Sequence, residues 1–148
     1  MEMRISKKAE YALRALVAMA RGPRWIQIQE LSRQENIPVK FLEQIMLSLK
    51  QGGLLTSKRG VGGGYSLRMK PSEISIGDVV TIIDGPIAPI PCAAVPPVEQ
   101  CNCPDPPTCP VRLTMIEIRQ DLAHSLRRRT IEDVVRIVPD AEHLVFEI

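Results

Sequence analysis

Four cysteines are the side chains of this sequence best suited to metal or redox chemistry, and all of them fall in one proline-rich stretch. They are Cys92, Cys101, Cys103 and Cys109, and residues 86–110 also hold 9 of the 13 prolines. Thiolates bind iron–sulfur clusters and zinc, and two neighbouring thiols form a redox switch through disulfide exchange. Structural zinc sites usually carry paired C-x2-C motifs. Since this stretch has only Cys101-Asn-Cys103, the zinc signal is weak.

The prolines decide the structure expected around these thiols. Proline lacks a backbone N–H and disfavours both helices and central strands, so residues 86–110 are predicted to form a loop. A loop of about 25 residues is more often functional, or ordered by a ligand, than a plain connection. We therefore predict a sensor loop, and inert free thiols are the alternative.

The sequence lacks the features of an exported or membrane-bound protein. No window approaches the roughly 20 apolar residues that span a bilayer. Residues 1–8 carry no apolar segment followed by a cleavage site. A cytoplasmic location is expected, where thiols serve metal or redox chemistry rather than structural disulfides.

Charge is divided unevenly along the chain, whose net charge is +2. Residues 1–70 carry a net charge of +8 and residues 71–148 one of −6. A basic half of this kind indicates a module that meets a polyanion, the alternative being ordinary solvated helix faces. Aromatic residues make up only 3% of the chain, and single-stranded nucleic acids are usually bound by stacking on several aromatic rings. The composition therefore favours duplex DNA as the polyanion.

Three helices are predicted in the basic half. Apolar residues at helical spacing place the first between residues 6 and 22, and the second over about 28–34. Residues 36–38 then form a turn, because the proline at its end excludes helical angles from the residue before it, and a third helix follows over 39–51. This order is typical of a helix-turn-helix, and an ordinary helical hairpin is the alternative.

The third helix has the pattern of a recognition helix. Its inward face is predicted from apolar residues at i, i+3, i+4 and i+7, which are Leu42, Ile45, Met46 and Leu49. Lys40, Glu43 and Gln44 then point outward, where the first residues of a recognition helix reach base edges in the major groove. Gln44 suits adenine, Lys40 suits guanine or phosphate, and Glu43 suits the amino group of cytosine.

A β-hairpin with a glycine-rich tip is predicted next. Residues 54–58 and 65–68 have the composition of short strands, and Arg59-Gly-Val-Gly-Gly-Gly64 joins them. Glycines let a tip approach phosphates closely, and Arg59 suits a minor groove, where negative potential is concentrated. The segment is no nucleotide-binding loop, because G-x-x-x-x-G-K-[ST] is absent. We interpret it as a wing.

The second half is predicted to supply the assembly element. Residues 76–83 form an apolar-faced helix that packs on the basic module. After the loop, a heptad-like seam is formed by Val111, Met115, Ile118, Leu122 and Leu126. Two such helices, packed about a two-fold axis, would set two recognition helices about 34 Å apart. A monomer with this helix folded onto its own core is the alternative, and Thr130 is expected to cap a last helix through Val138.

Several motifs together resemble the Rrf2 family of winged-helix transcription regulators, over residues 3–130. They are Phe41-Leu-Glu-Gln-Ile45, Gly53-Leu-Leu55, Arg59-Gly-x-Gly-Gly-Gly-Tyr-x-Leu67 and Ile76-Gly-Asp-Val-Val80. The resemblance implies a homodimer that binds a partly palindromic operator in double-stranded DNA, with a long C-terminal helix as the dimer element. The DNA-binding residues that we predict are Lys40, Phe41, Glu43, Gln44, Lys58, Arg59, Gly60 and Gly62.

The resemblance also implies an iron–sulfur cluster, in the two-iron two-sulfur form or, alternatively, the four-iron four-sulfur form. Cluster-binding members carry C-x5-C-x5-C; here Cys103-x5-Cys109 matches the second half, and Cys101 competes with Cys103 for the middle position. Arg112 occupies the position of the histidine that completes the site in some members. The predicted ligands are Cys92, Cys103 and Cys109, with Cys101 or Glu10 of the partner subunit as the fourth.

The predicted fold is mainly α-helical with a small β-hairpin wing, a winged helix-turn-helix followed by a long C-terminal dimerisation helix. Its parts are a DNA-binding domain over 1–84, a sensor loop over 85–110, and the dimerisation helix and tail over 111–148. We expect a transcription repressor that senses iron–sulfur, redox or nitrosative state. A clusterless regulator controlled by thiol oxidation or a protein partner is the alternative. No enzyme is expected, because His124 and His143 lie in no nucleophile or metalloprotease spacing.

Overall fold

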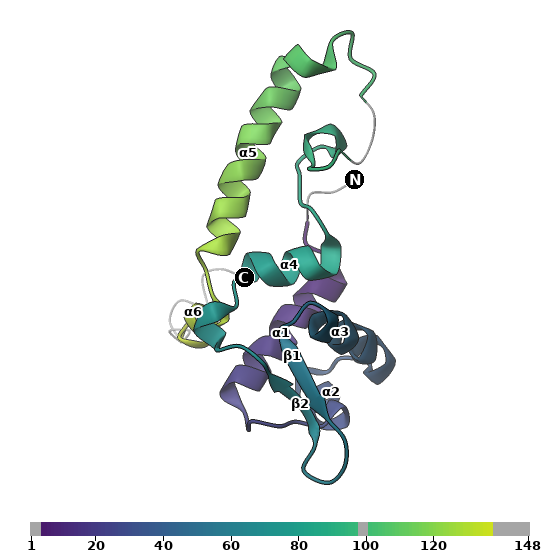
Figure 1. Cartoon of the computed structure of the whole chain (residues 1–148), viewed down its shortest axis with the longest axis vertical. Coiled ribbons are helices and arrows are strands. Elements are labelled where there is room, and N and C mark those ends of the chain that lie inside the picture. Colours follow the sequence, from purple (N-terminus) through teal and green to yellow (C-terminus); the bar gives the residue numbers. More distant parts are fainter. Residues whose placement is uncertain (1–3, 98–100, 138–148) are drawn as a thin grey trace, which may run out of the picture.

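The computed structural model describes residues 4–97 and 101–137, and that part of the chain forms six α-helices and one two-stranded antiparallel sheet (Figure 1). The helices are α1 (Lys7–Arg21), α2 (Ile28–Glu35), α3 (Val39–Gln51), α4 (Ile76–Asp84), α5 (Pro110–Arg127) and α6 (Ile131–Val135). The strands β1 (Leu55–Lys58) and β2 (Gly64–Leu67) lie between α3 and α4. The predicted fold class, mainly helical with a hairpin wing, is confirmed.

Local signals explain where the helices begin and end. The Ser6 hydroxyl accepts a hydrogen bond from the Ala9 N–H at the start of α1. α2 ends where Asn36 takes a left-handed conformation, with φ of 54°. α5 begins at Pro110, the last residue of the predicted loop, and the described part of the loop before it contains no α-helix, as expected. This part of the loop contains two short 3₁₀ turns, Pro91–Ala93 and Pro106–Thr108, each of which begins at a proline.

The last helix, α6, is shorter than predicted. Thr130 caps it as expected, because its hydroxyl accepts from the Asp133 N–H at 3.1 Å. The helix nevertheless ends at Val135, and its predicted end, Val138, lies outside the described residues. A proline follows Val138 in the sequence and disfavours helical angles at the residue before it, which explains why the prediction ran too far.

The core lies in the module built by α1 to α4 and the hairpin. Its fully buried residues come from all four helices and from α6, and they include Leu16, Leu31, Leu42, Ile45, Leu49, Val79 and Ile131. Ile131 enters this core from beyond α5, and its N–H donates to the Ile74 carbonyl at 2.9 Å. The Ile76 N–H donates in turn to the Arg129 carbonyl at 2.8 Å. The segment after α5 therefore returns to the N-terminal module, while the division into 1–84, 85–110 and 111–148 stays a prediction.

α5 projects from the module like a column, with the cysteine loop at its far end (Figure 1). None of its 18 residues is buried, and Val111, Leu113 and Ile118 are 61%, 46% and 42% exposed. The C-terminal half of α5 runs beside α4, where the two helices line a groove of about 790 Å³. No helix in the described part of the chain combines the length and the hydropathy needed to cross a bilayer.

Candidate functional site

The exposed start of α3 is the first candidate site. α3 follows the turn at 36–38, which the Ser32 hydroxyl closes by donating to the Ile37 carbonyl at 2.5 Å. The four apolar residues that were predicted to face inward are all buried. Lys40, Glu43 and Gln44 are exposed. The first turns of α3 thus present a cation, an anion and an amide to the solvent, and these are side chains that read base edges in the major groove.

Phe41, which is among the predicted DNA-binding residues, packs α3 against α1. Its ring is half-buried and meets the Tyr11 ring edge to face, with centroids 5.6 Å apart and planes at 77°. Such aromatic pairs stabilise packing beyond the area that they bury. Tyr11 lies on α1, so the contact holds the start of α3 against α1. A DNA contact of the Phe41 ring itself stays a prediction.

The wing is tied to the segment before α2 by contacts that the sequence did not reveal. Ile26 and Tyr65 exchange backbone hydrogen bonds of 3.0 and 2.8 Å. The Gln27 side-chain amide donates to the Gly63 carbonyl at 3.1 Å. Gly64 permits this close approach, because its φ is +123° and a Cβ there would overlap the Ile26 carbonyl oxygen. The hairpin is therefore held on the helix-turn-helix rather than left to swing.

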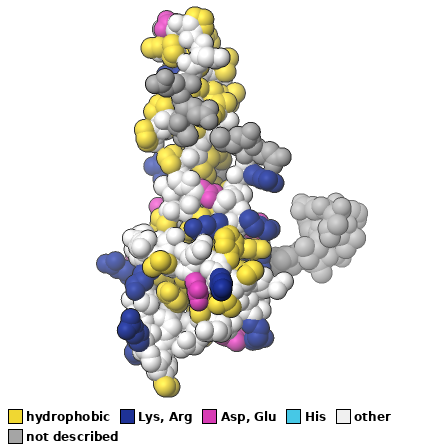
Figure 2. All heavy atoms as spheres, turned by 90° about the vertical axis from the view of Figure 1, so that its right-hand side faces the viewer, with side chains coloured by type: hydrophobic (Ala, Val, Ile, Leu, Met, Phe, Trp, Pro, Cys, Tyr) yellow, Lys and Arg dark blue, Asp and Glu magenta, His cyan; other side chains and the backbone are white. Residues whose placement is uncertain are grey.

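Cations lie on the edge of the wing. Lys58 and Arg59 are exposed, and the Lys58 ammonium lies over the Trp25 ring, 5.7 Å from its centroid. Gly60 and Gly62, at the tip, are exposed and have φ of 94° and 76°. Figure 2 shows Lys and Arg side chains gathered on the globular part of the molecule, whereas hydrophobic side chains cover much of the column. The wing thus offers the cationic edge that phosphate contact requires.

Three of the four cysteines in the proline-rich loop lie side by side. The Cys103 Sγ is 2.7 Å from the Cys101 Sγ and 3.6 Å from the Cys109 Sγ. Two thiolates on one tetrahedral metal ion, with bonds of about 2.3 Å, are about 3.8 Å apart. The Cys103–Cys109 distance fits such a pair, and the Cys101–Cys103 distance is too short for one. Among the described residues, no three His, Cys, Asp or Glu side chains form a preassembled metal site.

Protons are unevenly distributed among these thiols. Hydrogen bonding to Cys101, and next to Cys109, raises the pKa of the Cys103 thiol to about 12. The contact with Cys103 lowers the pKa of Cys101. The Arg112 backbone N–H, followed by the Cys103 thiol, lowers the pKa of Cys109. Cys103 therefore keeps its proton while its neighbours ionise first, and the thiolate is the reactive form of cysteine.

Two arginines of α5 hold the Cys92 end of the loop. The Arg112 Nε donates to the Cys92 carbonyl at 3.2 Å, and the Arg119 Nη1 donates to the Ala93 carbonyl at 2.9 Å. Arg112, at the position where some cluster-binding members have a histidine ligand, thus binds a backbone carbonyl in this chain. Because the two arginines stand about two helical turns apart, they fasten the turn Pro91–Ala93 along α5.

Glu10 does not meet the thiols within its own chain. It lies exposed on α1, and its carboxylate pairs with the Lys7 ammonium at 3.0 Å. Within the described part of the chain, the side-chain hydrogen bonds that this carboxylate accepts come from Lys7 and not from the cysteine loop. Metal ligation by Glu10 would therefore need the partner subunit, as the prediction supposed.

Three helices in helix-turn-helix order, an anchored hairpin and an exposed polar face on α3 define a winged-helix DNA-binding protein. A sequence profile of the Rrf2 family, described as "Iron-dependent Transcriptional regulator", matches residues 5–137. The chain belongs to this family, as its motifs predicted. It is a DNA-binding transcription regulator and not an enzyme.

Individual relatives agree with this assignment. A putative HTH-type regulator, Rrf2-like, from Rhodobacter capsulatus is 36% identical over 137 residues, which cover 88% of this chain and 91% of that protein. The HTH-type transcriptional regulator IscR of Aliivibrio salmonicida is 36% identical over 86 residues, 55% of this chain and 50% of IscR. The structure of CymR, the global cysteine regulator of B. subtilis, is similar with a TM-score of 0.74 at 28% identity, over 93% of this chain and 100% of CymR.

Proposed function

We propose that this chain is a homodimeric repressor that binds a partly palindromic operator in double-stranded DNA. The observation that carries the proposal is the exposure of polar and charged side chains on two neighbouring elements: Lys40, Glu43 and Gln44 on α3, and Lys58 and Arg59 on the wing. α3 would lie in the major groove, with Gln44 on base edges, and Arg59 in the adjacent minor groove. The cytoplasmic location expected from the sequence belongs to this proposal.

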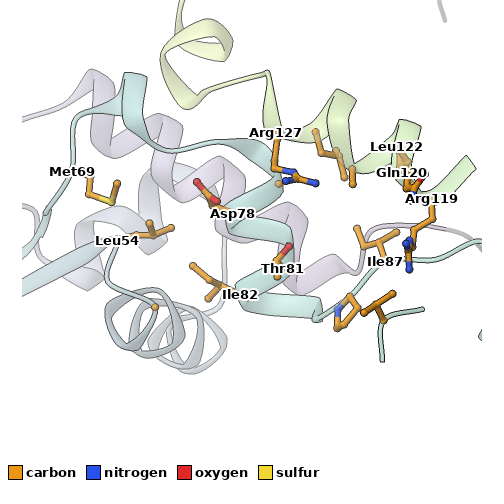
Figure 3. A pocket seen from close by; sticks show the side chains of 16 residues that line it. Leu54, Met69, Asp78, Thr81, Ile82, Ile87, Arg119, Gln120, Leu122 and Arg127 are labelled. Carbon is orange, nitrogen blue, oxygen red and sulfur yellow. The ribbon is translucent and has the colours of Figure 1, made fainter. Parts of the chain in front are cut away.

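The dimer rests on the unpaired face of α5. Val111 and Ile118 of the predicted seam are exposed. Farther along the helix, Leu122 and Leu126 line the groove between α4 and α5, which is mainly apolar and has Ile82 on its opposite side (Figure 3). A second α5, packed about a two-fold axis, would cover this face and hold two α3 helices about 34 Å apart.

We propose further that the cysteine loop controls DNA affinity. An iron–sulfur cluster, of the two-iron or four-iron type, would be held by Cys92, Cys103 and Cys109, with Cys101 or Glu10 of the partner subunit as the fourth ligand. Support comes from the description of the family as iron-dependent and from four free thiols in one loop. Bound iron would supply redox chemistry there. With Cys101 as the fourth ligand the loop would have to open, because the sulfurs of Cys101 and Cys103 are too close for two ligands.

A clusterless thiol switch is the second candidate, and the sulfur distances favour it. Cys103 is the neighbour of both Cys101 and Cys109. Oxidation of either pair by a peroxide forms one S–S bond, and the two thiol protons and two electrons pass to the peroxide. CymR, whose fold this chain shares, is a cysteine regulator.

DNA binding is tested with a duplex that the wild-type protein enriches from a randomised library. The logarithm of the binding constant should fall linearly with the logarithm of salt concentration, and Arg59→Ala should reduce the steepness of that slope by about 0.9. Gln44→Ala should relax base preference by about 1–3 kcal/mol. Gln34→Ala is the matched control, because Gln34 lines a separate hollow with α1 and α6. A wild-type chain that enriches no duplex at low salt would contradict the proposal.

Spectroscopy of protein purified without air separates the two sensing candidates. A held cluster gives visible absorbance, which Cys92→Ser should abolish. A colourless protein in which peroxide joins Cys103 to a neighbouring cysteine, detected by mass spectrometry, favours the thiol switch. Either sensor should change DNA affinity by about 1–3 kcal/mol between its two states. An affinity that is the same in every state would contradict sensing by this loop.

A further inference from the structure

The tip of the wing carries an apolar side chain that is fully open to solvent. Val61 is 106% exposed, and it stands between Gly60 and Gly62, where an added Cβ would meet no atom within 4 Å. Turn positions more often carry Asn, Asp, Gly or Ser. Exposure alone assigns Val61 no function, since single exposed aliphatic residues are common on protein surfaces.

A closed turn presents this side chain from a fixed point. The Gly63 N–H donates to the Gly60 carbonyl at 3.1 Å, so residues 60–63 form a β-turn with Val61 as its first central residue. Gly62, the second central residue, has φ of 76°, as in a type II turn. The hydrogen bond from Gln27 to Gly63 ties the same turn to the segment before α2. Little conformational freedom is therefore lost when Val61 meets a partner.

The shape and charge around Val61 fit the minor groove of DNA. Its neighbours in the turn are all glycines, so the tip is narrow, and the minor groove of B-DNA is about 6 Å wide. Lys58 and Arg59 precede it on the same arm of the hairpin and are exposed, so that their cations are free to meet phosphates. Proteins that bind the minor groove combine cationic side chains with apolar ones that enter at base steps.

We propose that Val61 is the apolar contact of the wing in the minor groove, beside the Arg59 side chain and with the Lys58 ammonium on a bordering phosphate. The inference rests on the proposed DNA-binding function. Val61 would bury its methyl groups against sugars and base edges and so add affinity without releasing counterions. It would also favour A·T pairs at that step, because the guanine amino group occupies the floor of the groove.

Three substitutions in the full chain test this contact. Val61→Thr keeps the shape and replaces one methyl group by a hydroxyl, Val61→Ser removes most of the apolar surface, and Val61→Ile enlarges it. Affinity for the duplex enriched by the wild-type protein should fall about threefold in the first and about tenfold in the second, and should be retained in the third. The salt slope should stay unchanged in all three, in contrast to Arg59→Ala. All should melt at the wild-type temperature, because Val61 is fully exposed.

The outcomes separate this inference from the function on which it rests. Wild-type affinity in Val61→Ser would overturn the contact while leaving DNA binding through α3 and Arg59 intact. A lower salt slope in Val61→Ser would also overturn the proposed contact, because it would mean that the whole wing had lost its contacts with the DNA phosphates. A wild-type protein that binds no duplex would overturn the proposed function itself.

Discussion

Cys103 lies between two thiols that ionise more readily than it does. Its pKa is raised to about 12 by its hydrogen bonds to Cys101 and then Cys109, whereas the pKa of each neighbour is lowered. Because a thiolate is the nucleophile and a protonated thiol is not, the three cysteines differ in reactivity although they touch. An oxidant should therefore react first at a flanking cysteine. Oxidation removes the negative charge of that neighbour, which is one cause of the raised pKa, and Cys103 should then ionise and close the disulfide.

Alkylation of the metal-free protein across a pH series should resolve these thiols. Since the pKa values of Cys101 and Cys109 are lowered, their thiolates form below the pH at which an ordinary cysteine ionises, and iodoacetamide should modify them there. Cys103, whose pKa is raised to about 12, should be the slowest of the three to react. Cys103→Ala removes a hydrogen bond to Cys101 and should slow alkylation at Cys101. Peptide mass spectrometry measures each rate, and equal rates at neutral pH would count against this ionisation order.

The thiol site could be predicted from the sequence only in part. The type and density of the cysteines are local facts, and they indicated metal or redox chemistry directly. Which sulfur lies beside which depends on how the turns Pro91–Ala93 and Pro106–Thr108 fold back toward α5. Arg112 was foreseen only as a replacement for a histidine. Its bond to the Cys92 carbonyl had no sequence signal, because every residue carries a backbone carbonyl.

Among the elements, the wing depends on its neighbours for stability. A two-stranded hairpin is marginally stable by itself in water. This one has Leu55 in the core, the backbone bridge to Ile26, and a hydrogen bond of 2.6 Å from the Lys50 ammonium to the Ser57 hydroxyl. Lys50 lies in the last turn of α3, so the recognition helix and the wing are joined directly. We expect the two DNA-contacting elements to move as one unit.

Two glycine substitutions in the wing should differ sharply in cost. Gly64→Ala should lower the free energy of unfolding by about 3 kcal/mol or more, because the new Cβ would overlap the Ile26 carbonyl and the backbone would have to shift. Gly60→Ala is the matched control. At Gly60 the φ is positive but the new Cβ would contact no atom, so Gly60→Ala should lower the free energy of unfolding by about 1 kcal/mol. Urea unfolding followed by circular dichroism measures both, and equal losses would show that the Ile26 contact contributes nothing.

Helices with strong local signals were predicted almost to the residue. The bounds of α1 to α3 follow from caps, a proline turn and apolar residues at helical spacing, all of which act within a few residues. The start of α6 was predicted from its cap, Thr130, but its packing against the core could not be predicted in the same way. Ile131 is one apolar residue in a five-residue helix, and the backbone that pairs with its N–H belongs to Ile74, far away in the sequence. Long-range backbone pairing of this kind produces no periodic pattern of residue types in the sequence.

The whole molecule divides into a module with a core and a column without one. All the large, fully buried side chains of the described residues belong to the module, and α5 contributes none of them. A projecting helix with Val111 and Ile118 in water is an apolar surface of the kind that marks an interface. The exposed apolar face of α5 in one chain therefore supports the proposed homodimer, because a second α5 would cover it.

A charge placed in the α5 seam should separate the subunits. Ile118→Glu should leave the helical circular dichroism unchanged, because the side chain is 42% exposed, and should convert the dimer to a monomer in sedimentation equilibrium. Affinity for a palindromic duplex should fall about 100-fold, since each half-site is then bound alone. Glu117→Gln, at the adjacent exposed position, is the control and should remain dimeric. A dimeric Ile118→Glu, or a wild-type monomer, would refute the seam.

Two backbone hydrogen bonds, from Ile76 to Arg129 and from Ile131 to Ile74, attach the C-terminal end of α5 to the DNA-binding module. An 18-residue helix is about 27 Å long, so the sulfur atoms near its N-terminal end lie far from this attachment. A tilt of α5 by about 5° about its attached end corresponds to a displacement of about 2 Å at the thiols. If the loop controls DNA affinity as proposed, a chemical step that moves it by about 2 Å would need only a small rotation of the DNA-binding module. In the proposed homodimer, that rotation would change the spacing of the two α3 helices.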